Sequence, residues 1–149
     1  HRDLHSFPTR RSSDLEWVDP FFTSGHWIPE MIQIAGGENL ISSEKMPSRK
    51  MKLEEIKEVN PDIIVMMPCG FDVKRTVSEY NNVLAKNPDW NELKAVKENR
   101  VYAVDANSYF SKPSLRTITG IEILAKITHP DVFDDFQLPK DSFMNISSK

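Results

Sequence analysis

The sequence predicts an α/β fold, a Rossmann-like parallel sheet flanked by helices. Short continuous apolar runs at residues 62–67 and 100–104 are typical of parallel strands buried on both faces. Segments with apolar residues at a 3.6-residue period alternate with these runs, and this alternation is typical of a parallel sheet covered on both sides. The 149 residues suffice for one domain with a hydrophobic core.

The first third of the chain predicts one helix between two short strands. Residues 16–18 are expected to end a strand, which Pro20 breaks. Pro29 suits the first turn of a helix, and Gly36 with Gly37 is a usual stop signal. Residues 39–41 follow as a second short strand.

The rest of the chain predicts four further helices. The first starts at Ser48 or Lys50 and ends before Pro61. Asp72 is a candidate cap for the second, and Pro88 opens a short third one. The last runs from Pro113 to residue 129. Residues 132–149 are expected to form an irregular tail.

Composition and motifs exclude several function classes. A net charge of −3 gives no electrostatic footprint for nucleic acid, and no apolar run is long enough to span a membrane. Cys69 is the single cysteine, so neither an internal disulfide nor a cysteine-rich metal site is expected. Dinucleotide and phosphate-loop motifs are absent, and His26 and His129 do not have metal-motif spacing. We therefore expect no catalytic cofactor.

Three loops follow predicted strands, at residues 19–27, 68–72 and 105–112. Ligands of open parallel sheets bind beyond the carboxyl ends of the strands. The loops carry seven aromatic or imidazole side chains: Phe21, Phe22, His26, Trp27, Phe71, Tyr109 and Phe110. Together they predict a surface for a flat apolar ligand, the alternative being that several of them fold back into the core.

His26 and three further residues each have two interpretations. His26 offers a nitrogen to a metal centre in a ligand, or it is a hydrogen-bonding loop residue. Cys69 is a nucleophile or a small filler. Glu30 stabilises a helix N-terminus or is a docking charge, and Arg116 is structural or reaches a ligand amide or carboxylate.

Residues 1–15, HRDLHSFPTRRSSDL, show neither a strand nor a helix period. They resemble, over the whole stretch, the translation of a common short-read sequencing adapter. We interpret them as an adapter-derived artefact, expect them to be disordered and exclude them from the fold. The alternative is a basic, disordered arm. On the first interpretation the natural gene is interrupted before Glu16, and the first strand is cut short.

Three longer segments resemble a known family: EWVDPFFTSGHWIPEMIQIAGGENL, LEEIKEVNPDIIVMMPCGFD and RVYAVDANSYFSKPSLRTITGIEILAKITHP. Residues 16–131 are similar to the C-terminal lobe of class III, cobalamin-type substrate-binding proteins of ABC importers. The resemblance implies two Rossmann-like lobes joined by a long helix, a ligand held between them, and no catalysis.

The resemblance also implies roles for individual residues. The ligand-binding candidates are Trp17, Phe21, Phe22, His26, Trp27, Phe71, Tyr109, Phe110 and Arg116, with Glu30 for permease docking. Two departures stand out. Ala35 and Ala125 lie where some relatives have a disulfide, and Ser111 with Lys112 lies where some have an acidic residue, which bears on permease docking.

The expected function is therefore binding of cobalamin or a related corrinoid and its delivery to an ABC permease. We expect an extracytoplasmic monomer, in the periplasm or on the outer face of the membrane with a lipid anchor in the full-length protein, and no nucleic-acid partner. Three alternatives stay open: a ferric-siderophore or haem binder, a small α/β enzyme using Cys69 or His26, and a structural interaction domain with buried aromatics.

Overall fold

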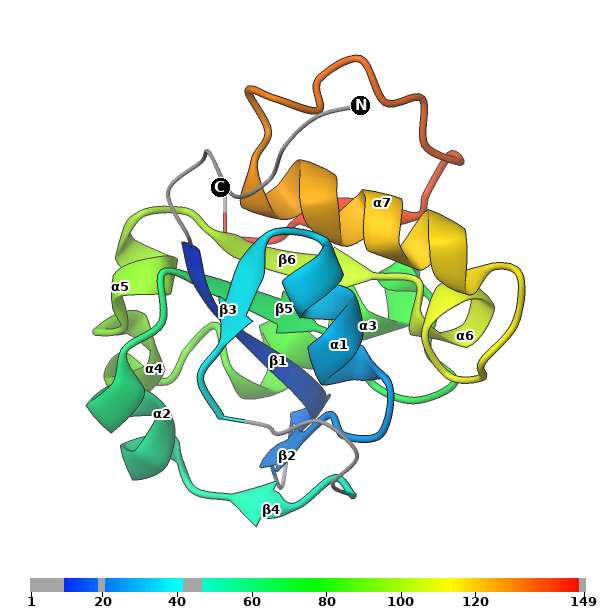
Figure 1. The fold of residues 1–149 in the computed structure, drawn as a ribbon. Coiled ribbons are helices and arrows are strands. Elements are labelled where there is room, and N and C mark those ends of the chain that lie inside the picture. Colours follow the sequence, from blue (N-terminus) through cyan, green and yellow to red (C-terminus); the bar gives the residue numbers. More distant parts are fainter. Residues whose placement is uncertain (1–9, 19–20, 42–46, 148–149) are drawn as a thin grey trace.

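The computed structural model describes residues 10–18, 21–41 and 47–147, with the backbone alone described at residues 12 and 16–18. It is an α/β fold with one sheet between two helical layers (Figure 1). The strands are β1 Arg10–Val18, β2 Phe21–Thr23, β3 Gly37–Asn39, β4 Lys50–Met51, β5 Ile63–Met66, β6 Val101–Val104 and β7 Phe143–Asn145. The helices are α1 Ile28–Ile34, α2 Leu53–Val59, α3 Val73–Val83, α4 Pro88–Asn91, α5 Lys94–Lys97, α6 Ala106–Tyr109 and α7 Thr117–Thr128.

The sheet is parallel at its centre and antiparallel at its edges. Its order is β4-β2-β1-β5-β6-β7, and β3 also pairs with β1. The pairs β1–β3, β1–β5 and β5–β6 are parallel, whereas β1–β2, β2–β4 and β6–β7 are antiparallel. The predicted Rossmann-like centre is confirmed. The edge strands were not predicted as antiparallel, because each is only two or three residues long.

One face of the sheet is covered by α1 and α7, which lie side by side in Figure 1. Ile32, Val65 and Ile123 are each at most 2% exposed in the core beneath them. Phe133, from the segment after α7, is 6% exposed and closes the same cluster. This layer stands next to the loops at the carboxyl ends of β1, β5 and β6.

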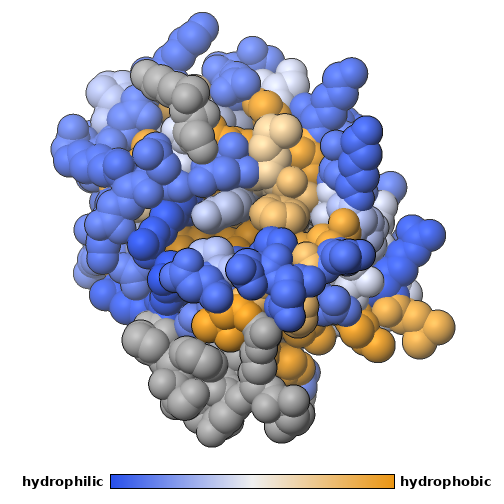
Figure 2. Space-filling view, turned by 90° about the horizontal axis from the view of Figure 1, so that it is seen from above, coloured by the Kyte–Doolittle hydropathy of each residue, from blue (hydrophilic) through white to orange (hydrophobic). Residues whose placement is uncertain are grey.

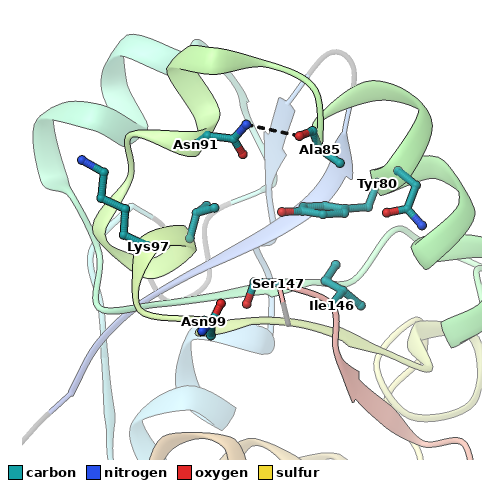
Figure 3. A pocket seen from close by; sticks show the side chains of 9 residues that line it. Tyr80, Ala85, Asn91, Lys97, Asn99, Ile146 and Ser147 are labelled. Atoms are coloured by element: carbon teal, nitrogen blue, oxygen red, sulfur yellow. Dashed lines mark hydrogen bonds between the residues drawn. The ribbon is translucent and has the colours of Figure 1, made fainter. Parts of the chain in front are cut away.

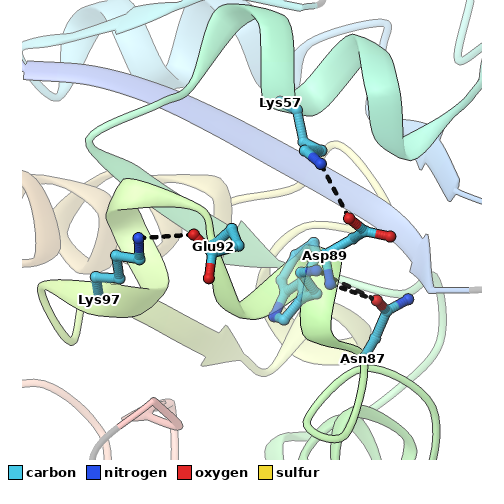
Figure 4. A network of polar contacts seen from close by, with 6 residues as sticks. Lys57, Asn87, Asp89, Glu92 and Lys97 are labelled. Carbon is cyan, nitrogen blue, oxygen red and sulfur yellow. Dashed lines mark hydrogen bonds and ion pairs between the residues drawn. The ribbon is translucent and has the colours of Figure 1, made fainter.

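The other face is covered by α2, α3, α4 and α5 around Trp90, which is fully buried. The indole nitrogen of Trp90 donates to the Tyr80 hydroxyl at 3.0 Å, and burial raises the pKa of Tyr80. Asn87 caps α4, and Lys57 on α2 pairs with Asp89 on α4 at 3.0 Å (Figure 4). Such exposed ion pairs contribute little, so apolar burial holds this layer.

Strand β1 corrects an expectation. Residues 1–15 were expected to be disordered, yet Arg10 to Leu15 form the first part of a central strand. Ser13, Asp14 and Leu15 are fully buried; they pair with β5, and Leu15 also pairs with Thr23 of β2. Residues 1–9 lie outside the described residues. The adapter origin of the sequence stays a prediction.

The tail is also corrected. Residues 132–149 were expected to be irregular, but β7 pairs with β6 and Phe133 packs in the core. Residues 48–59 form β4 and then α2, because Met51 pairs with Phe21 across β4 and β2. Among the described residues, no helix is both long and apolar enough to cross a membrane.

Several local predictions are confirmed. The Asp72 carboxylate accepts a hydrogen bond from the Arg75 backbone at 2.8 Å and caps α3. Pro29 lies in the first turn of α1, and Pro88 opens α4. Asn60 ends α2 in a left-handed conformation with φ 41°.

Candidate functional site

The three predicted loops meet in a pocket at the carboxyl edge of the parallel strands. Its volume is about 50 Å³. One side comes from residues 24–28, another from Met67 and Cys69 after β5, and the third from Phe110 and Ser111 after α6. The complete lining is Ser24, Gly25, His26, Trp27, Ile28, Met67, Cys69, Phe110 and Ser111. The convergence expected for strand-end loops is present in this structure.

Hydrogen bonds join the loops to one another. The indole nitrogen of Trp27 donates to the Phe110 carbonyl at 3.2 Å. The Gly70 backbone donates to the Ser111 hydroxyl at 3.0 Å, and the Asn107 backbone donates to the Phe71 carbonyl at 3.0 Å. Each bond crosses from one loop to another, so the pocket walls are fixed by the protein.

The middle of β1 anchors the first loop. The buried Asp14 carboxylate accepts from the Ser24 backbone at 3.1 Å and from the side chain of Asn39. The Met67 backbone donates to the Leu15 carbonyl at 2.8 Å. These contacts tie the first and second loops to one central strand.

Gly120 on α7 sets how closely α6 approaches the pocket. A Cβ at Gly120 would lie 2.8 Å from Met31 Cε and 2.9 Å from the Tyr109 carbonyl oxygen. It would also lie 3.2 Å from the Phe110 ring. Any larger residue would therefore displace the backbone that carries Tyr109 and Phe110.

Not all predicted ligand-facing residues reach the pocket. Phe21 lies on β2 and not in a loop; its ring stacks on Trp90 with centroids 5.9 Å apart and packs against the core on the other face of the sheet. Phe22, the next residue of the strand, points to the opposite face and is half-buried. Phe71 is 7% exposed, and the Arg75 guanidinium lies 3.8 Å from its ring centre.

The remaining predicted residues surround the pocket or lie outside the described side chains. Tyr109 is half-buried and packs against the α1–α7 core. Glu30 and Arg116 are exposed and do not line the pocket. Trp17 lies in β1 by its backbone, and its side chain is outside the described part of the chain.

Two apolar side chains at the start of α7 are exposed. Leu115 and Ile118, just before and within the first turn of α7, are 88% and 62% exposed. In the view from above, hydrophobic residues reach the surface between hydrophilic ones (Figure 2).

Comparison with known proteins identifies the family. The family model described as "Periplasmic binding protein" matches residues 16–108. The chain belongs to this family. The staphylococcal "High-affinity heme uptake system protein IsdE" is 33% identical over 85 residues, which is 56% of this chain and 28% of that protein. The chain thus spans less than a third of that curated relative.

Solved structures of periplasmic binding proteins share the fold. The TroA-like protein FepB of Veillonella parvula superposes with a TM-score of 0.73 at 19% identity, over 94% of this chain and 49% of that one. The vitamin B12 binding protein BtuF of Vibrio cholerae gives 0.67 at 20% identity, over 89% and 48%. The match therefore corresponds to about one half of such a protein. The description of the family places its members in the periplasm.

One feature of this periplasmic binding protein was not predicted. The sequence places no histidine near Cys69, yet His26 and Cys69 line the same pocket, and both are exposed. Their residues are 43 positions apart by numbering. Only the position of each loop after a parallel strand could have indicated this proximity.

A larger hollow of about 810 Å³ lies away from these loops, between α3, α4, α5 and the segment after β7 (Figure 3). Three of its polar groups bond within the fold. Asn91 donates to the Ala85 carbonyl at 3.2 Å, Lys97 pairs with Glu92 at 2.9 Å, and the Ser147 hydroxyl accepts from the Val101 backbone. Size alone therefore does not make this hollow the better candidate.

Proposed function

We propose that this chain is the C-terminal lobe of an ABC importer's substrate-binding protein and that it binds cobalamin or a related corrinoid. The observation that carries the proposal is the pocket that three strand-end loops form with Trp27 and Phe110 in its walls. Parallel α/β sheets bind ligands at this edge. Delivery to a permease is part of this proposal and is supported by the family description, "Periplasmic binding protein".

The chemistry of the pocket suits a flat, amide-edged ligand. Its lining combines Trp27, Phe110, Ile28 and Met67 with the hydroxyls of Ser24 and Ser111. Ligand sites are usually apolar with a few polar groups that fix orientation. None of the lining residues is lysine, arginine, aspartate or glutamate. This favours a corrinoid over a ligand whose carboxylates require cationic partners.

We propose further that a second lobe completes the site. A cavity of about 50 Å³ is far smaller than the ligand. The lobe described here therefore contributes one wall of the site, and the second lobe contributes the other. Leu115 and Ile118 would be covered on closure. In this proposal Arg116 lies next to the ligand and Glu30 next to the permease. The protein acts in the periplasm or on the outer face of the membrane.

Haem is the second candidate ligand. The relative named as a high-affinity heme uptake protein is 33% identical over 85 residues. A structure titled "Periplasmic Heme Binding Protein" from Pseudomonas aeruginosa shares the fold at 16% identity. Both ligands are flat metal macrocycles, and they differ in the charge at their edges.

Isothermal titration with cyanocobalamin, haemin and a ferric hydroxamate siderophore separates these candidates. We expect saturable binding of cyanocobalamin, weaker than about 1 μM because only one wall of the site is present. Trp27→Ala should weaken it several-fold, whereas Met144→Ala, an exposed apolar residue outside the pocket, should not.

Two results would contradict the proposal. If haemin or the siderophore binds saturably and cyanocobalamin does not bind, the ligand is not a corrinoid. Submicromolar affinity of this chain alone for cyanocobalamin would contradict the two-lobe account, since it would require a complete site. Circular dichroism of each variant checks that a lost signal is not lost folding.

A further inference from the structure

Two metal-coordinating side chain types face the pocket from different loops. His26 follows β2, Cys69 follows β5, and both are exposed. Within the described residues, no group of three or more histidine, cysteine or acidic side chains could hold a metal ion. Two donors do not fill the tetrahedral set that a bound ion such as zinc takes from a protein. One donor is enough when a macrocycle already surrounds the metal and leaves one axial position for an outside ligand.

The backbone holds His26 at the rim of the pocket. Its φ is 59°, in the left-handed region that residues other than glycine rarely adopt. The turn around it is closed by a hydrogen bond from the Ile28 backbone to the Gly25 carbonyl at 3.2 Å. The imidazole also contacts the Trp27 ring, with centroids 5.6 Å apart. Unusual backbone conformations that persist in this way concentrate at functional sites.

We propose that His26 ligates the metal centre of the transported macrocycle, so that the affinity of the site depends on the metal as well as on the ring. This rests on the proposed function. In a cobalt(III) corrinoid that carries an exchangeable water, the lone pair of a neutral imidazole nitrogen forms a bond to cobalt and the water leaves. No electron is transferred and no proton is released.

His26 is a better candidate than Cys69 for this bond. A thiol must lose its proton before it becomes a strong metal ligand, whereas neutral imidazole is already competent. Cys69 lies on the wall formed by the loop after β5, and His26 lies beside Trp27, the aromatic ring against which the macrocycle would lie.

Aquocobalamin and cyanocobalamin test the assignment, because they share the ring and differ in the axial ligand. Aquocobalamin has a replaceable water, and cyanocobalamin has a firmly held cyanide. We expect the chain to bind aquocobalamin at least about tenfold more tightly. Its visible spectrum should change to that of an imidazole-ligated corrinoid on binding. The cyanocobalamin spectrum should stay unchanged.

Matched variants locate the ligand. His26→Asn removes the imidazole but keeps a residue that tolerates the left-handed conformation, so the fold should persist. It should abolish the preference for aquocobalamin and the spectral change, so that the two corrinoids bind with similar affinity. Met144→Ala, on an exposed residue outside the pocket, should retain both signals.

Three outcomes would overturn the inference. Equal affinities for the two corrinoids with an unchanged spectrum would show that corrinoids bind without axial ligation by the protein. Loss of the preference in Cys69→Ser but not in His26→Asn would assign the bond to sulfur. If neither corrinoid binds, the proposed function fails together with this inference.

Discussion

Strands β1 and β5 lie side by side at the centre of the sheet and have opposite chemistry. Ser13 of β1 pairs with Ile64 of β5, and Asp14 pairs with Val65. All four residues are at most 2% exposed. β5 is apolar throughout, as expected for a parallel strand buried on both faces. β1 has the same burial without the same composition.

The buried polar groups of β1 differ in whether they have hydrogen-bond partners. The Asp14 carboxylate accepts from the Ser24 backbone and the Asn39 side chain. The Ser13 hydroxyl has no hydrogen-bond partner among the described residues. A buried polar group without a partner costs free energy, so β1 weakens the sheet at the position where β5 strengthens it.

The largest effect is expected from β5. Ile64→Ala removes a fully buried side chain and should lower the free energy of unfolding by about 2 to 5 kcal/mol. Urea unfolding followed by circular dichroism measures it. Ile34→Ala, on a side chain that is 50% exposed, is the control and should change little. A loss below about 0.5 kcal/mol for Ile64→Ala would mean that β5 is not packed as described.

A smaller effect of opposite sign is expected at the paired position on β1. Ser13→Val removes the unpartnered hydroxyl and adds apolar contact, so it should raise the free energy of unfolding by about 1 kcal/mol. Ser13→Ala separates the two contributions, because it removes the hydroxyl without filling space. Destabilisation by both variants would show that Ser13 has a partner in solution.

If residues 1–15 are adapter-derived, as the sequence predicts, the polarity of this strand has a direct explanation. An unrelated sequence in the place of a buried natural strand would not have the apolar residues that such a strand requires. The genomic sequence directly before Glu16 tests this: it should encode an apolar run in place of Ser12 to Asp14. The same polar residues in the genome would refute the interpretation.

The smallest effect concerns the amino end, where Asp62 joins the two strands. Its carboxylate accepts from the Arg11 backbone at 3.1 Å and pairs with Lys94 at 2.7 Å. Burial acts to raise the pKa of Asp62, but the hydrogen bonds from Lys94 and Arg11 outweigh it and leave the pKa below 3.8. Because the folded pKa is lowered, this contribution is present above pH 3.8 and is lost as the pH falls through the folded pKa.

The pH dependence of unfolding measures that contribution. Asp62→Asn should flatten the acid limb by less than about 1 kcal/mol, since the pair is partly exposed. Asp89→Asn, which breaks the more exposed pair with Lys57, should leave the limb nearly unchanged. If wild type and Asp62→Asn have the same acid limb, the contacts of Asp62 with Arg11 and Lys94 do not contribute to the acid sensitivity of the fold.

Local signals predicted much of the fold and part of the site. The apolar runs gave β5 and β6, and Asp72 and Pro88 marked helix starts, because caps and periods act within a few residues. The three loops were placed at one edge because parallel strands end together. Trp27 and Phe110 therefore line the pocket as expected, whereas Phe21 stacks on Trp90 instead.

The sequence by itself determined the alternating α/β order, the parallel centre and the edge that carries the pocket. Only the tertiary structure decided which polar stretch became β1, that the tail supplies β7, and that His26 and Cys69 share one pocket. The physical reason is range. Helix periods and caps depend on neighbouring residues, whereas strand pairing and pocket walls depend on contacts between residues far apart in the chain.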